Sequence, residues 1–352
     1  MPETVPQIFL HQAKLIKPVL QHTFEQAVQW YPETQLSQEL LPQLAEFATA
    51  GKLVRGSLLL HSWQLLANQS QQTQIPVSEP SQIAAAIELI HSGLLVHDDI
   101  IDQDQTRRNQ PCIYLKFAQL SDGVHNPHQG TSLAISSGIL LYFLATHLIN
   151  QTRLPSHVVQ SINQVIGQEI SRTALAEMND VYFGYQASAQ PETILHIHAY
   201  KTGRYTFHLP FKLAFLLAGA DWDETNWSKL SHNLGIIYQL QDDLLNIFAD
   251  PQVTGKSIGS DVKDNKKTLF RYFVGQHDPH QLELYFGKSD LTVDQLQQFA
   301  QTEVAGYARQ KTQDTIQQYV KQSQLLIDQL QLPKKMTDFL HQLLLYLTNR
   351  DK

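Results

Sequence analysis

Three aspartates lie within five positions of the chain. Asp98 and Asp102 are four residues apart, so on a helix they share one face, and Asp99 lies beside them. Carboxylates this close repel one another unless a cation joins them, and Mg²⁺ prefers a few carboxylates together with phosphate oxygens. Two arginines follow, Arg107 and Arg108, and a guanidinium binds phosphate well. The spacing therefore indicates a metal and diphosphate site.

The residues around these acids distinguish that site from a solvated acidic face, which is the ordinary interpretation of an isolated D-D-x-x-D. Leu94 and Leu95 precede the acids, and Ile100 and Ile101 lie between them. Such a helix is largely buried, and buried carboxylates need a partner. The apolar surroundings favour the metal site.

A similar segment recurs in the second half of the chain. Residues 235–250 form an apolar helical pattern that carries Asp242, Asp243 and, one turn later, Asn246. Two such helices could face each other across a cavity and bind several metal ions with one diphosphate between them.

Together the two motifs resemble the first and second aspartate-rich motifs of the trans-polyprenyl diphosphate synthases. The resemblance extends from about Gly51 to Leu269. It implies an all-α isoprenoid synthase fold, a helical bundle around a central cavity, formed as one domain by residues 1–352. Helical periodicity dominates the sequence, which agrees with that fold class.

The resemblance also implies a role for each matching residue. About three Mg²⁺ ions would bridge the allylic diphosphate to Asp98, Asp102 and Asp242, with Asp99 and Asp243 in support. The same diphosphate would be held by Arg107, Lys201 and Lys256, with Lys266 closing near the site. Thr202 and Gln239 would lie beside the allylic cation. Isopentenyl diphosphate would be bound by Lys52, Arg55, His91 and Arg108.

Without the resemblance several of these residues have ordinary explanations. Lys52 and Arg55, expected on one helix face, would be surface cations, and His91 would be a core histidine. Residues 155–184 are expected to form a long helix, and Gly203 to bend the helix that carries Lys201 and Thr202.

The implied reaction is the head-to-tail condensation of isopentenyl diphosphate with an allylic diphosphate (dimethylallyl, geranyl or farnesyl), giving an all-trans polyprenyl diphosphate. Three alternatives stay open. A farnesyl diphosphate synthase differs only in product length. A class I terpene cyclase would have no use for the second set of cations. A regulatory subunit of a heteromeric prenyltransferase would not need the full set of aspartates.

Product length is predicted from the residues that precede Asp98. The tail is expected to run towards the N-terminus of this helix, past Leu94, Gly93 and Ile90. Farnesyl-forming relatives have an aromatic floor four or five residues before the aspartate. Gly93 has no side chain, which predicts an open floor and a product of geranylgeranyl length or longer.

Three positions depart from the family pattern. Asn246 replaces the last aspartate of the second motif, which keeps an oxygen ligand but removes its charge. Asn109 follows the arginine pair where glycine is usual, and Ile139 follows Gly138 where an aspartate is usual.

Composition limits the other function classes. The net charge of −7 argues against nucleic acid as a partner. A single cysteine, Cys112, excludes an internal disulfide framework and fits a cytoplasmic location. We see no signal peptide, and residues 133–149, although uncharged, are expected to form a core helix rather than a transmembrane segment. A homodimer is the family expectation.

Overall fold

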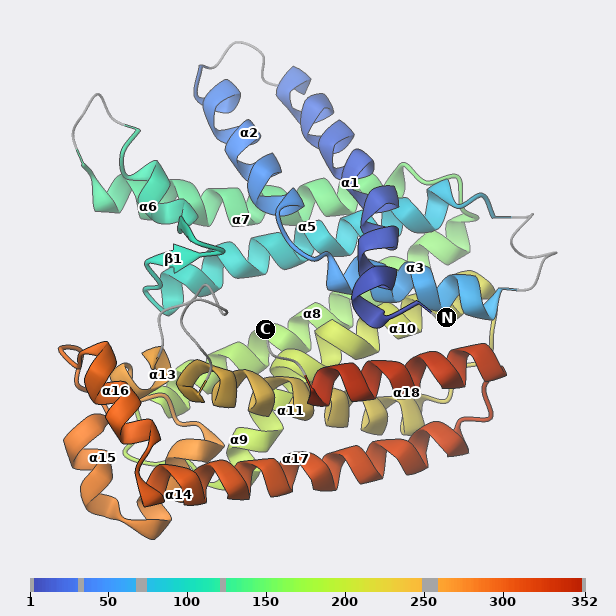
Figure 1. Cartoon of the computed structure of the whole chain (residues 1–352). Coiled ribbons are helices and arrows are strands. Elements are labelled where there is room, and N and C mark those ends of the chain that lie inside the picture. The colour runs from blue at the N-terminus through green and yellow to red at the C-terminus, as the bar shows by residue number, and fades with distance from the viewer. Residues whose placement is uncertain (1–2, 31–34, 68–74, 121–124, 249–258, 350–352) are drawn as a thin grey trace. The chain divides into compact units, whose positions relative to one another are not determined.

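The computed structural model describes residues 3–30, 35–67, 75–120, 125–248 and 259–349. Nearly all its regular structure in these ranges is helical (Figure 1), and the strands found there are β1 and β2, of two residues each. The all-α prediction is confirmed. The chain divides into two compact units, residues 1–165 with 210–221 and residues 166–209 with 222–352, which we describe separately. The prediction of one domain over residues 1–352 stays a prediction.

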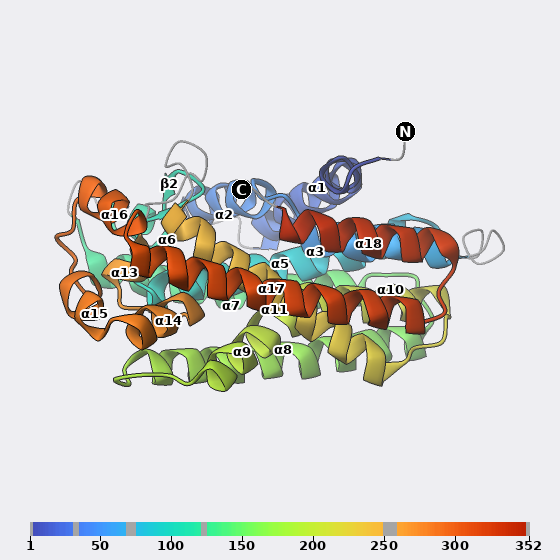
Figure 2. The same ribbon diagram turned by 60° about the horizontal axis from the view of Figure 1, so that its bottom comes forward.

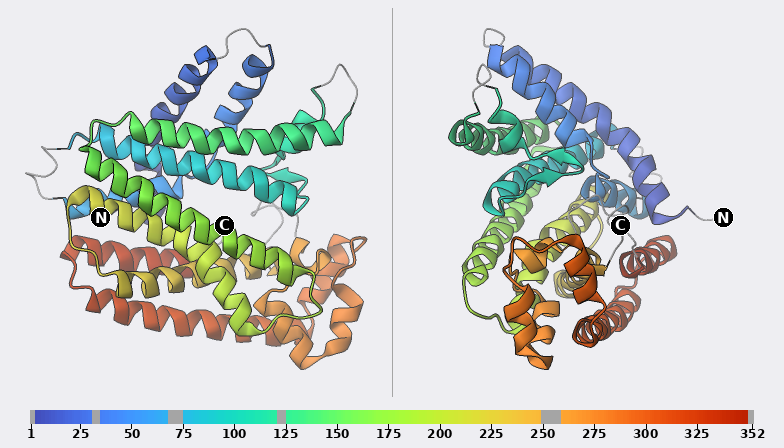
Figure 3. Two further views of the ribbon diagram at one scale, coloured as in Figure 1. Left: turned by 180° about the vertical axis from the view of Figure 1, so that it is seen from behind. Right: turned by 60° about the vertical axis from the view of Figure 1, so that its left-hand side comes forward.

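The first unit is built around α5. Its elements are α1 (Val5–Trp30), α2 (Gln35–Thr49), α3 (Val54–Leu66), α5 (Ser78–Ile101), β1 (Thr106–Arg107), β2 (Gln110–Pro111), α6 (Ile113–Phe117), α7 (Pro127–Asn150), the first part of α8 (Ser156–Gly184) and most of α10 (Leu209–Ala218). Helix α5 packs against α1, α2, α3, α6 and α7, and Figure 3 shows α5 and α7 running side by side. The segment Ile83–Leu89 is almost fully buried because neighbours cover nearly every face of α5.

Helix α3 begins later than the sequence indicates. Leu53 adopts the left-handed conformation (φ 49°), and the helix starts at Val54. Lys52 is therefore exposed ahead of the helix and does not share a helix face with Arg55, so this expectation was wrong. Bulky side chains disfavour positive φ, so the sequence does not indicate that Leu53 adopts this conformation.

A tight hairpin follows α5 and presents the arginine pair. Thr106 pairs with Pro111 and Arg107 with Gln110, so Arg108 and Asn109 form a two-residue loop. Both loop residues have positive φ (55° and 61°), as a type I′ turn requires. Asparagine tolerates this conformation better than most residues, which explains Asn109 at a position where glycine is usual.

Helix α7 has one buried face and one exposed apolar face. Ile135, Ile139 and Phe143 follow one another at four-residue intervals and are all exposed, Phe143 by 67%. By length and composition α7 could cross a membrane, but a core helix in a soluble protein meets the same criterion. The predicted core helix is thus only half buried. Ile139 lies in the exposed stripe.

The second unit holds the rest of α8, α9 (Pro191–His198), η1 (Ala199–His208), α11 (Glu224–Phe248), α13 (Ser260–Lys263), α14 (Leu269–His277), α15 (Pro279–Tyr285), α16 (Val293–Ala300), α17 (Glu303–Gln329) and α18 (Lys334–Thr348). Thr292 and Gln295 form a capping box at the start of α16. Figure 2 shows α17 and α18 lying side by side, and both also pack on α11.

The segment expected to bend at Gly203 is a π-helix of ten residues, η1, and it packs closely on α11. A Cβ atom on Gly203 would lie 2.7 Å from the carbonyl oxygen of Ser231, and a Cβ on Gly235 would collide with the backbone of Gly203. Both glycines are needed because the two backbones touch. π-helical turns are rare in proteins, and those that do occur are often found at functional sites.

Candidate active site

Arg107 is the centre of the first acidic cluster. Its Nε donates to Oδ1 of Asp99 over 2.6 Å, and its Nη2 lies 3.0 Å from Oδ2 of Asp104 and 3.5 Å from Oδ2 of Asp98. Asp99 is almost fully buried, whereas Asp98 keeps a quarter of its side-chain surface exposed. Arg107 thus has these three carboxylates as partners, and its positive charge offsets the repulsion between these closely spaced acids.

Asp99 has a second partner in Cys112. The buried thiol hydrogen-bonds to Asp99, and burial, together with that carboxylate, raises the pKa of Cys112. Burial also raises the pKa of Asp99, although Arg107 opposes this shift. Asp99 therefore lies behind the accessible aspartates and fixes Arg107, which fits the supporting role predicted for it.

A second group of cations lies around the start of α3. Nη1 of Arg55 is 3.0 Å from Nε2 of His91 on α5. Burial, with the charges of Arg55, Arg108 and Arg107, holds the pKa of His91 well below its usual value, so the neutral ring accepts this hydrogen bond. The structure therefore brings together four of the predicted diphosphate ligands.

Glu88 lies under this cation group and was not identified from the sequence. The backbone N–H of Gly56 donates to its Oε1 over 2.7 Å. Burial raises the pKa of Glu88, whereas that hydrogen bond and the charges of Arg55 and Arg108 lower it. A buried carboxylate among like-charged guanidinium groups reduces their mutual repulsion.

Gly51 has a steric role that explains its place before the cations. A Cβ atom there would lie 2.6 Å from Nη2 of Arg108. The Arg108 guanidinium instead donates from Nη1 to the carbonyl oxygen of Phe47 over 2.7 Å and lies 5.4 Å from the centre of the Phe47 ring. The absent side chain at residue 51 makes room for Arg108.

In the second unit, two carboxylates of α8 hold Lys201. Its Nζ lies 2.7 Å from Oε2 of Glu177 and 2.8 Å from Oδ2 of Asp180. Burial would raise the pKa of Asp180, but Lys201, with help from His198 and Lys266, brings it below its usual value. The sequence pattern of α8 did not single out either acid.

Thr202, Gln239 and Asp243 form a hydrogen-bonded chain between η1 and α11. Thr202 Oγ1 lies 3.4 Å from Gln239 Oε1, and Gln239 Nε2 donates to Asp243 Oδ1 over 3.1 Å. Asp243 Oδ2 is buried without a hydrogen-bond partner, 3.7 Å from Nε2 of His198. Burial and the neighbouring Asp261 raise the pKa of Asp243 to about 8.

Asn246 is a structural tether. Its Nδ2 donates to Ser260 Oγ over 2.8 Å, and its Oδ1 accepts from the backbone N–H of Asp261 over 3.2 Å. Both amide atoms are thus used to hold α13 against α11. Lys266 lies 3.8 Å from Asp261, and Lys256 lies outside the described residues.

The donors fit Mg²⁺. In the first unit Asp98 and Asp102 are partly exposed carboxylates; in the second unit Asp242 is partly exposed and the buried Asp243 offers an oxygen without a partner. Among the described residues, no group of three or more histidine, cysteine or acidic side chains is arranged to hold a metal unaided. A hard cation that takes its remaining ligands from a phosphate and water suits either pair.

The structure changes the interpretation of Gly93. A Cβ atom there would lie 2.7 Å from Cε1 of Tyr142 and 3.0 Å from the carbonyl oxygen of Gly138. The space beside Gly93, which the sequence suggests is open, is therefore filled by the ring of Tyr142 from α7. On the same helix Ile90 is buried and Leu94 is half-buried. The path of the prenyl tail past these two residues stays a prediction.

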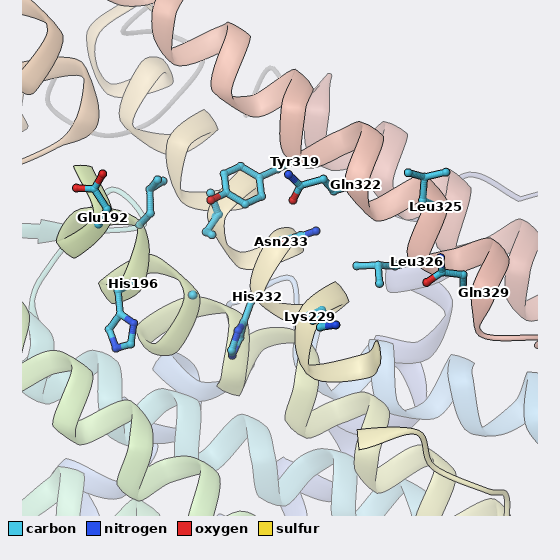
Figure 4. Close-up of a pocket in the computed structure, with 13 residues that line it drawn as sticks. Glu192, His196, Lys229, His232, Asn233, Tyr319, Gln322, Leu325, Leu326 and Gln329 are labelled. Atoms are coloured by element: carbon cyan, nitrogen blue, oxygen red, sulfur yellow. The ribbon is translucent and has the colours of Figure 1, made fainter. Parts of the chain in front are cut away.

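A separate cavity of about 660 Å³ lies between α9, α11 and α17 (Figure 4). The ring of Tyr200 stacks on that of His196, with centres 4.5 Å apart, and lies tilted to that of His232, with centres 4.9 Å apart; both histidines line the cavity. None of the predicted site residues that the structure describes contributes to its wall.

The comparison with family models decides the classification. The polyprenyl synthetase model matches residues 37–303, about three quarters of the chain. The chain belongs to the polyprenyl synthetase family.

Individual relatives agree with this family assignment. The chain is 31% identical to geranylgeranyl diphosphate synthase of Sulfolobus acidocaldarius over 226 residues, which cover 63% of this chain and 62% of that enzyme. It is 32% identical to mouse farnesyl pyrophosphate synthase over 232 residues, 64% and 63% of the two chains. The aligned region thus spans just under two thirds of these relatives.

Solved structures of the polyprenyl synthetase family have the same fold. Geranylgeranyl pyrophosphate synthase of Corynebacterium glutamicum superposes with a TM-score of 0.87 at 21% identity, over 96% of this chain and 98% of that one. The enzyme of that name from Pyrococcus horikoshii gives 0.75 at 25% identity, over 98% of both. The predicted isoprenoid synthase fold is confirmed.

Proposed function

We propose that this polyprenyl synthetase is a prenyltransferase that condenses isopentenyl diphosphate with an allylic diphosphate. The observation that supports this most is the gathering of Arg55, His91, Arg107 and Arg108 around the first aspartate motif. Two sets of anion ligands meet there, cations and metal-binding carboxylates, as a reaction with two diphosphates requires. The Sulfolobus and mouse relatives carry the names of such enzymes.

In this proposal, Asp98, Asp102 and Asp242 would hold Mg²⁺ ions, about three in all, together with the allylic diphosphate. Mg²⁺ bound there would supply positive charge to a departing diphosphate. The Corynebacterium structure was obtained with magnesium and isoprenyl diphosphate, which supports the assignment. Arg107 keeps Asp98 and Asp99 in place, and Lys201, positioned by Glu177 and Asp180, binds the same diphosphate.

The remaining site residues act on the carbon skeleton and on the second substrate. Thr202 and Gln239 place oxygen atoms beside the allylic carbons, with Gln239 oriented by Asp243. Arg55 and Arg108 bind isopentenyl diphosphate, with neutral His91 orienting Arg55. Lys52 keeps its predicted role as a ligand of isopentenyl diphosphate, Lys256 as a ligand of the allylic diphosphate, and Lys266 as a residue that closes near the site. Preorganised charges of this kind stabilise the transition state without rearrangement.

The test is an assay with Mg²⁺, labelled isopentenyl diphosphate and dimethylallyl, geranyl or farnesyl diphosphate in turn. We expect label in a longer prenyl diphosphate. A terpene cyclase would instead release hydrocarbon without isopentenyl diphosphate, and a regulatory subunit would be inactive alone. Arg55→Ala should raise the KM for isopentenyl diphosphate about ten- to a hundredfold and that for the allylic substrate much less.

The proposal includes a homodimer. The exposed stripe of Ile135, Ile139 and Phe143 belongs to a stretch of 17 uncharged residues on α7, and interface cores are depleted of charge. In the second unit, Leu175, Met178 and Tyr182 expose an apolar face of α8. A second copy of the chain would cover such faces.

Sedimentation tests the homodimer. Phe143→Glu should shift the chain from dimer to monomer, whereas Leu10→Glu, on an equally exposed leucine of α1, should not. A wild-type chain that sediments as a monomer at micromolar concentration contradicts this part of the proposal.

A further inference from the structure

Helices α5 and α7 are locked together by two reciprocal glycine contacts. Gly93 of α5 makes room for the ring of Tyr142, and Gly138 of α7 makes room for the ring of His97. Each helix thus supplies one glycine and, four residues later, one ring. The contacts run in opposite chain directions, so the two helices are antiparallel at this point. The space that each glycine leaves is therefore filled by a ring from the other helix.

Hydrogen bonds fix both rings. His97 Nε2 lies 3.1 Å from the carbonyl oxygen of Ile135 and therefore donates, because a carbonyl oxygen can only accept. In the neutral ring, His97 Nδ1 then accepts, and the hydroxyl of Tyr142, 3.2 Å away, donates to it. The two rings also meet edge to face, with centres 5.6 Å apart. Tyr142 is consequently held by its ring and by its hydroxyl.

The position of Tyr142 along α5 gives this arrangement a functional meaning. Gly93 precedes Asp98 by five residues, about 7.5 Å along the helix axis. The Tyr142 ring therefore lies beside α5 about one and a half turns from the carboxylates, on the side where Ile90 and Leu94 make α5 apolar. A prenyl chain whose diphosphate is held at Asp98 and whose tail follows that apolar surface reaches the level of Tyr142.

We propose that Tyr142, held by His97, is a specificity-determining residue that limits the length of the prenyl product. The inference rests on the proposed prenyltransferase function. Tyr142 comes from a different helix and takes the place of a side chain that α5 lacks at residue 93. The maximum length of the prenyl product then depends on the Gly93–Tyr142 pair, and it cannot be predicted from either residue alone.

The experiment compares product lengths of the wild type, Tyr142→Phe and Tyr142→Ala by chromatography. Tyr142→Ala opens space beside Gly93, and its main product should gain at least one isoprene unit. Tyr142→Phe keeps the ring and should retain the wild-type length. Tyr142→Leu, of intermediate size, serves if the alanine variant does not fold, and circular dichroism checks the fold of each variant.

A second readout does not need turnover. Tyr142→Ala should lower the Kd of geranylgeranyl diphosphate relative to that of geranyl diphosphate by roughly tenfold, because more methylene groups become buried. An active Tyr142→Ala with wild-type products and an unchanged Kd ratio would falsify the inference. A wild-type chain that forms no condensation product overturns the proposed function itself, and the inference with it.

Discussion

Arg204 of η1 donates two hydrogen bonds of 2.6 Å to Glu169 of α8, and both side chains are at least 96% buried. Nη1 of Arg204 also donates to Ser228 of α11 over 2.8 Å. A single guanidinium thus joins three helices of the second unit, and one of them carries Lys201 and Thr202. The Arg204–Glu169 pair positions the site without belonging to it.

Loss of one partner of the Arg204–Glu169 pair should destabilise the chain strongly. Glu169→Gln removes the nearest counter-charge of a buried guanidinium and leaves it Glu224, half-exposed and 3.7 Å away, so it should lower the free energy of unfolding by about 3–5 kcal/mol. Arg172→Ala is the control, because Arg172 contacts the same carboxylate but is 45% exposed, and it should cost less than about 1 kcal/mol. Urea denaturation measures both, and equal costs would contradict the positioning role.

The contact between η1 and α11 predicts different effects of alanine at two helical glycines. Gly203→Ala places a methyl group against the Ser231 carbonyl and should cost roughly 1–3 kcal/mol of stability. At Gly306 of α17 an added Cβ meets nothing within 4 Å, so Gly306→Ala should stabilise by about 0.5–1 kcal/mol. Thermal unfolding of both variants shows whether the signs differ.

Asp243 should make the metal-free protein less stable as pH rises. Its pKa is about 8 in the folded chain and 3.8 as the ordinary value, so the folded state holds an extra proton between these limits. The stability from this proton is fully present below pH 4 and is lost as pH rises to about 8, by at most about 1.4 kcal/mol per pH unit. Asp243→Asn should remove this slope in chelator-treated samples. An identical pH profile for both proteins would exclude Asp243 as its source.

Substitutions at Asn246 test whether its side-chain amide holds α13 against α11. Asn246→Ala removes two hydrogen bonds and should cost about 1–3 kcal/mol of stability. Asn246→Asp retains an acceptor for the Asp261 N–H and adds a hard ligand, so it should fold and need less Mg²⁺ for half-maximal activity. If Asn246→Asp loses as much stability as the alanine variant, the Asp261 N–H contact contributes nothing.

Much of the site could be predicted because its motifs are local. Asp98 lies in the last turn of α5 and Asp102 is its C-cap, while Asp242 and Asp243 lie on α11, as helical spacing indicates. What could not be predicted depends on pairs of residues distant in sequence. Tyr142 fills the space at Gly93 from 49 residues away, and Glu169 pairs with Arg204 across 35. Periodicity places a residue on a helix face but does not say which side chain lies opposite.

The direct contact of Gly203 with Gly235 has a consequence for how accurately the second unit holds its reactive groups. At an ordinary helix crossing a layer of side chains separates the two helices, and rotamer changes in that layer let the helices shift. No such layer exists at this crossing, so main chain rests on main chain. Thr202 precedes one glycine, and Gln239 follows the other by one helical turn. Their oxygens therefore take their spacing from the rigid peptide backbone, and small thermal displacements of the surrounding core should leave that spacing unchanged.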